Sequence, residues 1–111
     1  SVSCNSPLYM IGVADVNRYL VVNGYKDTQL KRKMMDMAAI REGRENYTSA
    51  SNMGTFFLRL YHSQCVGEGY DAKMREILFK QTDDECFVRV LPYTRIAHKM
   101  GELDCFYADG G

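Results

Sequence analysis

Apolar residues recur at helical spacing in three stretches of this chain, and the first of them covers residues 13–23. Its apolar positions fall on one side of a helix: Val13, Val16, Tyr19 and Leu20. Asp15 places a carboxylate in the first turn, where it suits the helix dipole, and Gly24 supplies a residue that can end the helix. The pattern predicts a helix over residues 13–23.

The second stretch has a strong amphipathic pattern. Its apolar residues repeat at intervals of three and four: Met53, Phe56, Phe57, Leu60 and Tyr61. The Ser and Thr residues at positions 48–51 precede it and can accept hydrogen bonds from the first free N–H groups of a helix. The pattern predicts a capped helix with a core-facing side, and His62 at its end is interpreted as structural.

The third stretch predicts a helix at about residues 70–81, after Gly67 and Gly69 break the chain. The residues turned inward would be Ala72, Met74, Ile77, Leu78 and Phe79. Between the first two helices, the composition of residues 31–39 favours a helix, although its Met residues define no clean face. The polar, glycine-broken residues 41–46 predict a solvated loop.

The C-terminal part of the chain has a different pattern. Residues 86–91 are β-branched and aromatic, end at Pro92 and fit either a strand or an extended loop. Residues 95–99 predict a buried strand, Gly101 a tight bend and residues 103–107 the returning antiparallel strand. The order of elements predicts an α+β fold, with a mainly helical body and a C-terminal antiparallel β-hairpin.

The 111 residues are enough for one domain with a modest core, with a helical part at about 1–82 and a strand part at about 86–108. The 14 basic and 14 acidic residues cancel, which argues against nucleic acid as a partner. The apolar runs are too short to span a bilayer, so no membrane span is expected. No signal peptide follows Ser1, and the chain is interpreted as a processed product or an excised piece.

The cysteines give no reason to expect a metal. They are Cys4, Cys65, Cys86 and Cys105, and none forms a Cys-x-x-Cys pair. Two disulfides in a secreted protein and buried free thiols are both compatible with this count. A cysteine-dependent activity is disfavoured, because neither His62 nor His98 stands in a recognisable Cys–His arrangement.

Lys99 is the candidate for recognition of an anion. It lies close to Gly101, which permits a turn or the close approach of a ligand. A lysine in this setting either anchors an anionic substrate group or is a solvated charge that protects an edge strand from aggregation. Composition alone favours the edge charge.

Three short motifs change this balance, and they follow one another along the chain at residues 11–20, 45–53 and 95–103. The first resembles the helix that follows the Ser-Asp-Asn element of class A serine β-lactamases and related penicillin-recognising enzymes. The second resembles the end of their omega loop with the next helix, and the third resembles the strand that bears their Lys-Thr-Gly element. The resemblance implies the helical subdomain of that fold with part of its antiparallel sheet.

The resemblance assigns roles to four positions. Ser3 and Asn5 match the first and third residues of Ser-Asp-Asn. It implies that Ser3 shuttles a proton toward the leaving nitrogen and that Asn5 orients the substrate's side-chain amide. Lys99 and Gly101 match the first and third residues of Lys-Thr-Gly, which implies that Lys99 anchors the carboxylate of a β-lactam or of a D-alanyl peptide.

The chain also departs from the family pattern. Cys4 replaces the carboxylate of the first motif, and Met100 replaces a hydroxyl that would help to hold the substrate, because Met100 donates no hydrogen bond. No serine here has a lysine three positions later, so the family's Ser-x-x-Lys nucleophile would lie upstream. The role of the family's deacylating glutamate is assigned to none of Asp36, Glu42 and Glu45.

The sequence therefore predicts a fragment or truncated form of a β-lactamase-like serine hydrolase, inactive alone because the attacking serine is absent. The alternative is a non-catalytic binding or interaction module derived from the same fold. The resemblance implies a β-lactam or peptide-like small molecule as partner, no cofactor, and a periplasmic or secreted location. Uncovered hairpin edges would also permit a homodimer or strand exchange.

Overall fold

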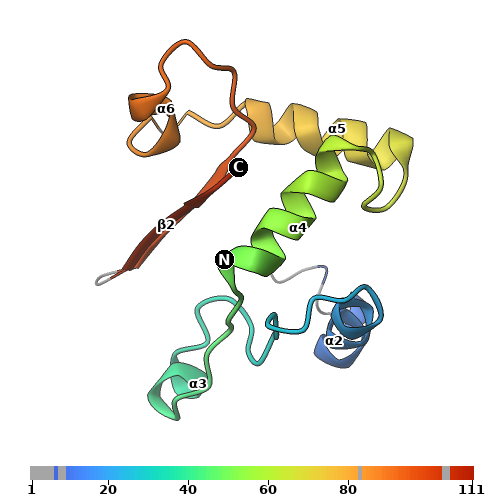
Figure 1. Cartoon of the computed structure of the whole chain (residues 1–111). Coiled ribbons are helices and arrows are strands. Elements are labelled where there is room, and N and C mark those ends of the chain that lie inside the picture. Colours follow the sequence, from blue (N-terminus) through green and yellow to red (C-terminus); the bar gives the residue numbers. More distant parts are fainter. Residues whose placement is uncertain (1–6, 8–9, 83, 104–105) are drawn as a thin grey trace. The chain divides into compact units, whose positions relative to one another are not determined.

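The computed structural model describes residue 7 and residues 10–82, 84–103 and 106–111. The elements in this part of the chain are α2 (Val13–Val22), α3 (Met37–Arg41), α4 (Ala50–Tyr61), α5 (Glu68–Phe79), α6 (Phe87–Val90), β1 (Lys99–Leu103) and β2 (Phe106–Gly110) (Figure 1). The predicted α+β fold, a helical body followed by a C-terminal antiparallel hairpin, is confirmed. The chain divides into two compact units, Ser1–Asn52 and Met53–Gly111, and α4 runs from the first into the second.

Helix α2 forms where the apolar spacing predicts it. Its C-terminus is closed by two backbone hydrogen bonds, from Tyr25 N to Leu20 O at 2.9 Å and from Gly24 N to Val21 O at 3.1 Å. Gly24 lies at φ +82°, in the left-handed region that a side chain disfavours. These bonds form the glycine-dependent helix end that the sequence predicts.

Residues 31–39 do not form the helix that their composition favours. The helical part is α3, a short helix that begins only at Met37. Met35 just before it lies at φ +58°, which a continuous right-handed helix does not allow. The Asp36 side chain accepts a hydrogen bond from Ala39 N at 3.1 Å and caps α3 there.

Helix α4 begins at the predicted cap, because the Ser49 hydroxyl accepts a hydrogen bond from Asn52 N at 3.1 Å. Leu60 is buried, with 2% of its surface exposed. The expectation that Met53 and Tyr61 are core residues is wrong, since 36% and 75% of their surfaces are exposed. Periodicity defines which side of a helix is apolar, but it does not define how much of that side finds a partner.

Helix α5 begins and ends about two residues earlier than predicted. Met74, Leu78 and Phe79 are half-buried, as expected for its inward side, but Ala72 and Ile77 are exposed, which the pattern did not predict.

The most buried residue of α5 is the acidic Asp71, which has no exposed surface. Its carboxylate accepts hydrogen bonds from the backbone N–H groups of Cys65 at 2.8 Å, Val66 at 2.9 Å and Gly67 at 3.3 Å. Burial by itself would raise the pKa of Asp71, but these hydrogen bonds and the charge of Arg75 hold that pKa below its ordinary value. Asp71 is therefore charged and ties the turn to the helix.

Residues 86–91 form neither the strand nor the extended loop that their composition suggested. They contain the short helix α6, closed by hydrogen bonds from Val90 N to Cys86 O at 3.3 Å and from Leu91 N to Phe87 O at 2.9 Å. The tendency of β-branched residues to form strands depends on packing within a sheet. No strand pairs with these residues in the described part of the chain.

The hairpin forms with a different register from the predicted one. β1 begins at Lys99, rather than at Arg95, and β2 is Phe106–Gly110, rather than residues 103–107. Gly101 is not a bend, because it lies within β1 and pairs with Ala108. The pairing of strands depends on cross-strand contacts that local composition does not report.

Candidate functional site

Lys99 stands at an accessible edge. β1 and β2 pair only with each other among the described residues, so each strand has one open edge. Lys99 is exposed, its ammonium donates to Met100 O at 2.5 Å, and no carboxylate in the described part of the chain pairs with it. A methyl group built on Gly101 would meet no atom within 4 Å. This edge carries an exposed positive charge with open space beside it.

The next side chain along β1 belongs to a different surface. Successive residues of a strand point to opposite faces, so Met100 and Glu102 face away from Lys99 and Gly101. Both line a hollow of about 490 Å³, together with Glu85, Cys86 and Tyr107. Its two carboxylates disfavour an anion. The charges of the hairpin therefore favour an anionic ligand on the Lys99 side.

The other two predicted site residues, Ser3 and Asn5, lie outside the described residues. Their proximity to Lys99 therefore stays a prediction. Cys4 and Cys105 lie outside as well, and Cys65 and Cys86 form no disulfide with each other. The described part of the chain has no group of three His, Cys, Asp or Glu side chains that could hold a metal ion.

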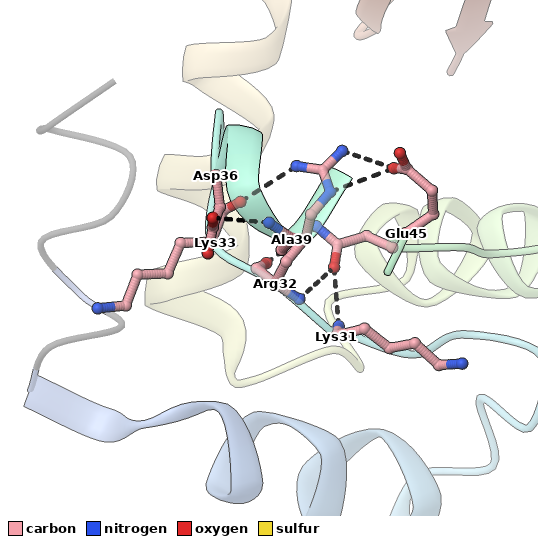
Figure 2. A network of polar contacts seen from close by, with 7 residues as sticks. Lys31, Arg32, Lys33, Asp36, Ala39 and Glu45 are labelled. Carbon is pink, nitrogen blue, oxygen red and sulfur yellow. Dashed lines mark hydrogen bonds and ion pairs between the residues drawn. The ribbon is translucent and has the colours of Figure 1, made fainter. Parts of the chain in front are cut away.

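Residues 31–46 form a loop whose ends are fastened to each other by a buried arginine (Figure 2). Only 9% of Arg32 is exposed, and its Nε and Nη2 donate to Glu45 Oε2 at 3.2 and 2.6 Å. Asn46 Oδ1 accepts from Lys31 N at 2.8 Å and from Arg32 N at 3.0 Å, and Asn46 Nδ2 donates to Arg32 O at 3.1 Å. Residues 41–45 are exposed, as the predicted solvated loop requires, and this network fastens the end of that loop to Arg32.

Every carboxylate of this loop already has a partner. Asp36 caps α3, Glu45 pairs with Arg32, and Glu42 Oε2 accepts from Arg44 Nη2 at 2.6 Å. A carboxylate that activates a water molecule must offer that water a free oxygen lone pair in a suitable position. Each of these contacts uses one oxygen of its carboxylate, so none of the three acids is assigned to that role or excluded from it.

The unit Met53–Gly111 contains an apolar hollow of about 470 Å³ that the sequence did not predict. It is lined by residues of α4, α5 and the segment before β1, Phe57, Leu60, Phe79 and Ile96 among them, and Lys99 does not line it. The guanidinium of Arg95 lies 4.3 Å from the centre of the Phe79 ring. Ala97 and Gly111 also line this hollow, so it lies next to the end of the hairpin that carries Lys99.

His98 and Asp109 form a buried pair beside β1 that the sequence did not predict. His98 Nδ1 lies 3.0 Å from Asp109 Oδ1, and only 2% and 3% of the two side chains are exposed. Neither residue carried a local signal, because burial of a polar side chain depends on contacts made across the fold.

The α+β architecture, with a helical body and a hairpin that presents a lysine, is the one expected of penicillin-recognising serine hydrolases. The family model described as the beta-lactamase enzyme family matches residues 5–111. The match covers nearly the whole chain, so the chain belongs to the beta-lactamase enzyme family. Comparisons with curated proteins and with solved structures give no match. No helix among the described residues is long and apolar enough to cross a membrane.

Proposed function

We propose that this chain carries the substrate-recognition part of a β-lactamase-like serine hydrolase, with Lys99 as the anchor for a substrate carboxylate. The observation that carries the proposal is the exposed ammonium of Lys99, which has no carboxylate partner among the described residues and lies at an open strand edge, in a chain of this family. A strand edge offers main-chain hydrogen bonds to an extended substrate, and the ammonium adds charge attraction. The substrate class is a β-lactam or a D-alanyl peptide, met in an extracytoplasmic compartment.

In the same proposal Ser3 passes a proton to the leaving nitrogen, Asn5 holds the substrate's amide, and Gly101 leaves room for the ligand at the strand. The attacking serine comes from another segment of the parent protein, because these 111 residues contain no Ser-x-x-Lys element. The 111 residues alone therefore bind substrate weakly and do not hydrolyse it.

The experiment has two arms on the purified chain. Nitrocefin should give no turnover above buffer, and benzylpenicillin should shift the amide resonances of residues 99–102 in a titration followed by NMR. Lys99→Met should weaken this binding by about tenfold or more. Lys73→Met is the matched control, because Lys73 is also exposed but lies on α5.

Three results would overturn the proposal. One is nitrocefin turnover by the wild-type chain that Ser3→Ala abolishes. Another is the absence of any benzylpenicillin shift in the wild type. The third is equal affinity of the wild type and Lys99→Met.

The second candidate is a non-catalytic interaction module. Met100 in place of a hydroxyl favours it, as do the open edges of the two-stranded sheet. It predicts saturable self-association or partner binding, with no effect of Lys99→Met on benzylpenicillin. Sedimentation over a concentration series tests self-association, and a strict monomer at high concentration argues against that form of the module.

A further inference from the structure

The surface pattern of the hairpin does little to fix its register. Five residues of the two strands are exposed: Lys99, Gly101 and Glu102 on β1, and Tyr107 and Ala108 on β2. A slip of one residue turns every side chain of a strand to the opposite face, and it is opposed only where one face is buried. Apolar burial along these strands therefore leaves the register weakly specified.

His98 and Asp109 supply the missing constraint. Asp109 pairs with Met100 across the hairpin, and His98 lies two residues before Met100, so both side chains point to the same face. They meet there at 3.0 Å with almost no exposure. The second carboxylate oxygen of Asp109 also accepts a hydrogen bond from Phe87 N at 3.4 Å. A slip by one residue would break this pair and carry Lys99 toward the buried face.

The backbone next to His98 is also closely packed. A methyl group built on Gly111 would lie 2.8 Å from Ala97 O and 2.9 Å from His98 Cβ, closer than real carbon atoms come. The end of β2 thus approaches His98 through its backbone as well as through Asp109. Only one register brings both contacts together.

We propose that His98 and Asp109 are a positioning pair: they set the register of the hairpin and thereby keep Lys99 exposed on the face opposite their own. Lys99 follows His98 directly, so fixing His98 inward directs Lys99 outward. The register part stands on the contacts of the hairpin alone. The consequence for an anion at Lys99 rests on the proposed function.

The proposal also fixes the tautomer of His98. A carboxylate only accepts hydrogen bonds, so Nδ1 carries the proton that it donates to Asp109. His98 Nε2 is buried and has no hydrogen-bond partner among the described residues. A neutral His98 is then protonated on Nδ1 alone. His62, the other histidine, is exposed and provides an internal reference in the same spectrum.

The test compares His98→Leu with His98→Asn, whose side-chain amide can donate to Asp109 from about the position of Nδ1. Hydrogen exchange of the β1 and β2 amides reports the register, and benzylpenicillin titration reports the presentation of Lys99. His98→Leu should speed the exchange and weaken the binding by about tenfold each, and His98→Asn should recover most of both. His62→Leu is the control and should change neither.

The two proposals fail in distinguishable ways. The positioning pair would be overturned if both His98→Leu and Asp109→Ala kept the amide hydrogen-exchange rates and the cross-strand contacts of the wild type. It would also be overturned by nitrogen-15 spectra that show His98 protonated on Nε2 alone. The spectra use the wild-type chain and do not depend on the folding of any variant. A hairpin that depends on His98 in a chain that does not bind benzylpenicillin would confirm the pair and reject the substrate anchor.

Discussion

The loop of residues 31–46 and the turn of residues 62–67 are both held by polar side chains, but the exposure of these side chains to water differs. The loop is closed by Arg32 on Glu45, and 50% of the Glu45 side chain is exposed. The turn is closed by Asp71, which has no exposed surface and accepts hydrogen bonds from three backbone N–H groups. In the loop, water can replace part of what a substitution removes. In the turn, the N–H groups would be left without their acceptor.

We therefore expect the burial of a polar contact, more than the number of contacts, to determine how much the contact stabilises each region. A buried donor without an acceptor costs its full desolvation, whereas an exposed one is hydrated at little cost. This matters in a chain whose buried apolar residues, among those described, are only Tyr25, Ala39 and Leu60. We therefore expect the polar side chains that close its turns and loops to contribute an unusually large share of its stability.

Asp71→Ala tests the role of burial most directly. Among the variants whose stability is compared, we expect it to show the largest fall in the free energy of unfolding, because the N–H groups of Cys65, Val66 and Gly67 lose their acceptor. Urea unfolding followed by circular dichroism measures it. Asp84→Ala, at an exposed acid, is the control. Equal midpoints for Asp71→Ala and the wild type would contradict the role of Asp71.

The same residue predicts a dependence on pH. The pKa of Asp71 is held below its ordinary value in the folded chain, so its contribution is fully present above the unfolded-state pKa of about 4. It is lost as the pH falls through the lower, folded pKa. Stability should therefore decrease below about pH 4, and Asp71→Asn should flatten this part of the profile.

A smaller effect is expected in the loop. Arg32→Met should lower the free energy of unfolding by about 2 kcal/mol. This loss is smaller than the one expected for Asp71→Ala, because Glu45 can be hydrated after it loses its buried partner. Arg44→Met is the matched control, since Arg44 pairs with Glu42 on the surface with 54% and 63% of the two side chains exposed. It should cost less than about 0.5 kcal/mol. Equal losses for the two arginines would show that burial does not decide the outcome.

Two glycines of the hairpin extend the comparison to packing. A methyl group on Gly110 would lie 2.9 Å from the Phe57 ring, whereas on Gly101 it would meet nothing within 4 Å. Gly110→Ala should therefore destabilise the hairpin by about 1 kcal/mol, and Gly101→Ala should be nearly neutral. Thermal unfolding of the two variants measures the difference. A larger loss in Gly101→Ala would contradict the packing.

The smallest effect concerns reactivity rather than stability. Burial raises the pKa of the Cys65 thiol, and the charge of Asp71 raises it further, so less thiolate is present at pH 8 than in an ordinary cysteine. Iodoacetamide should alkylate Cys65 more slowly than a cysteine in an unfolded peptide. Asp71→Asn should speed the reaction if the fold is retained. A rate at the peptide value in the wild type would contradict this prediction.

Some features of the fold could be predicted because they depend on neighbours in sequence. Helix α2 with its Gly24 end, and helix α4 with its Ser49 cap, follow from spacing and from contacts within a few residues. The sequence placed Lys99 at the end of a strand and Gly101 at a bend, whereas β1 begins at Lys99 and contains Gly101. The partners expected for Lys99 are Ser3 and Asn5, which lie outside the described residues, and their role stays a prediction.

The tertiary structure alone decided the rest. Arg32 finds Glu45 thirteen residues away, and His98 finds Asp109 eleven residues away, across a register that composition placed differently. Residues 86–91 became helical despite β-type side chains, since no strand pairs with them in the described structure. The sequence determined which segments could be helices or strands. Which polar groups are buried, and which face carries Lys99, depended on contacts between segments, because burial and register are properties of a pair of surfaces and not of one.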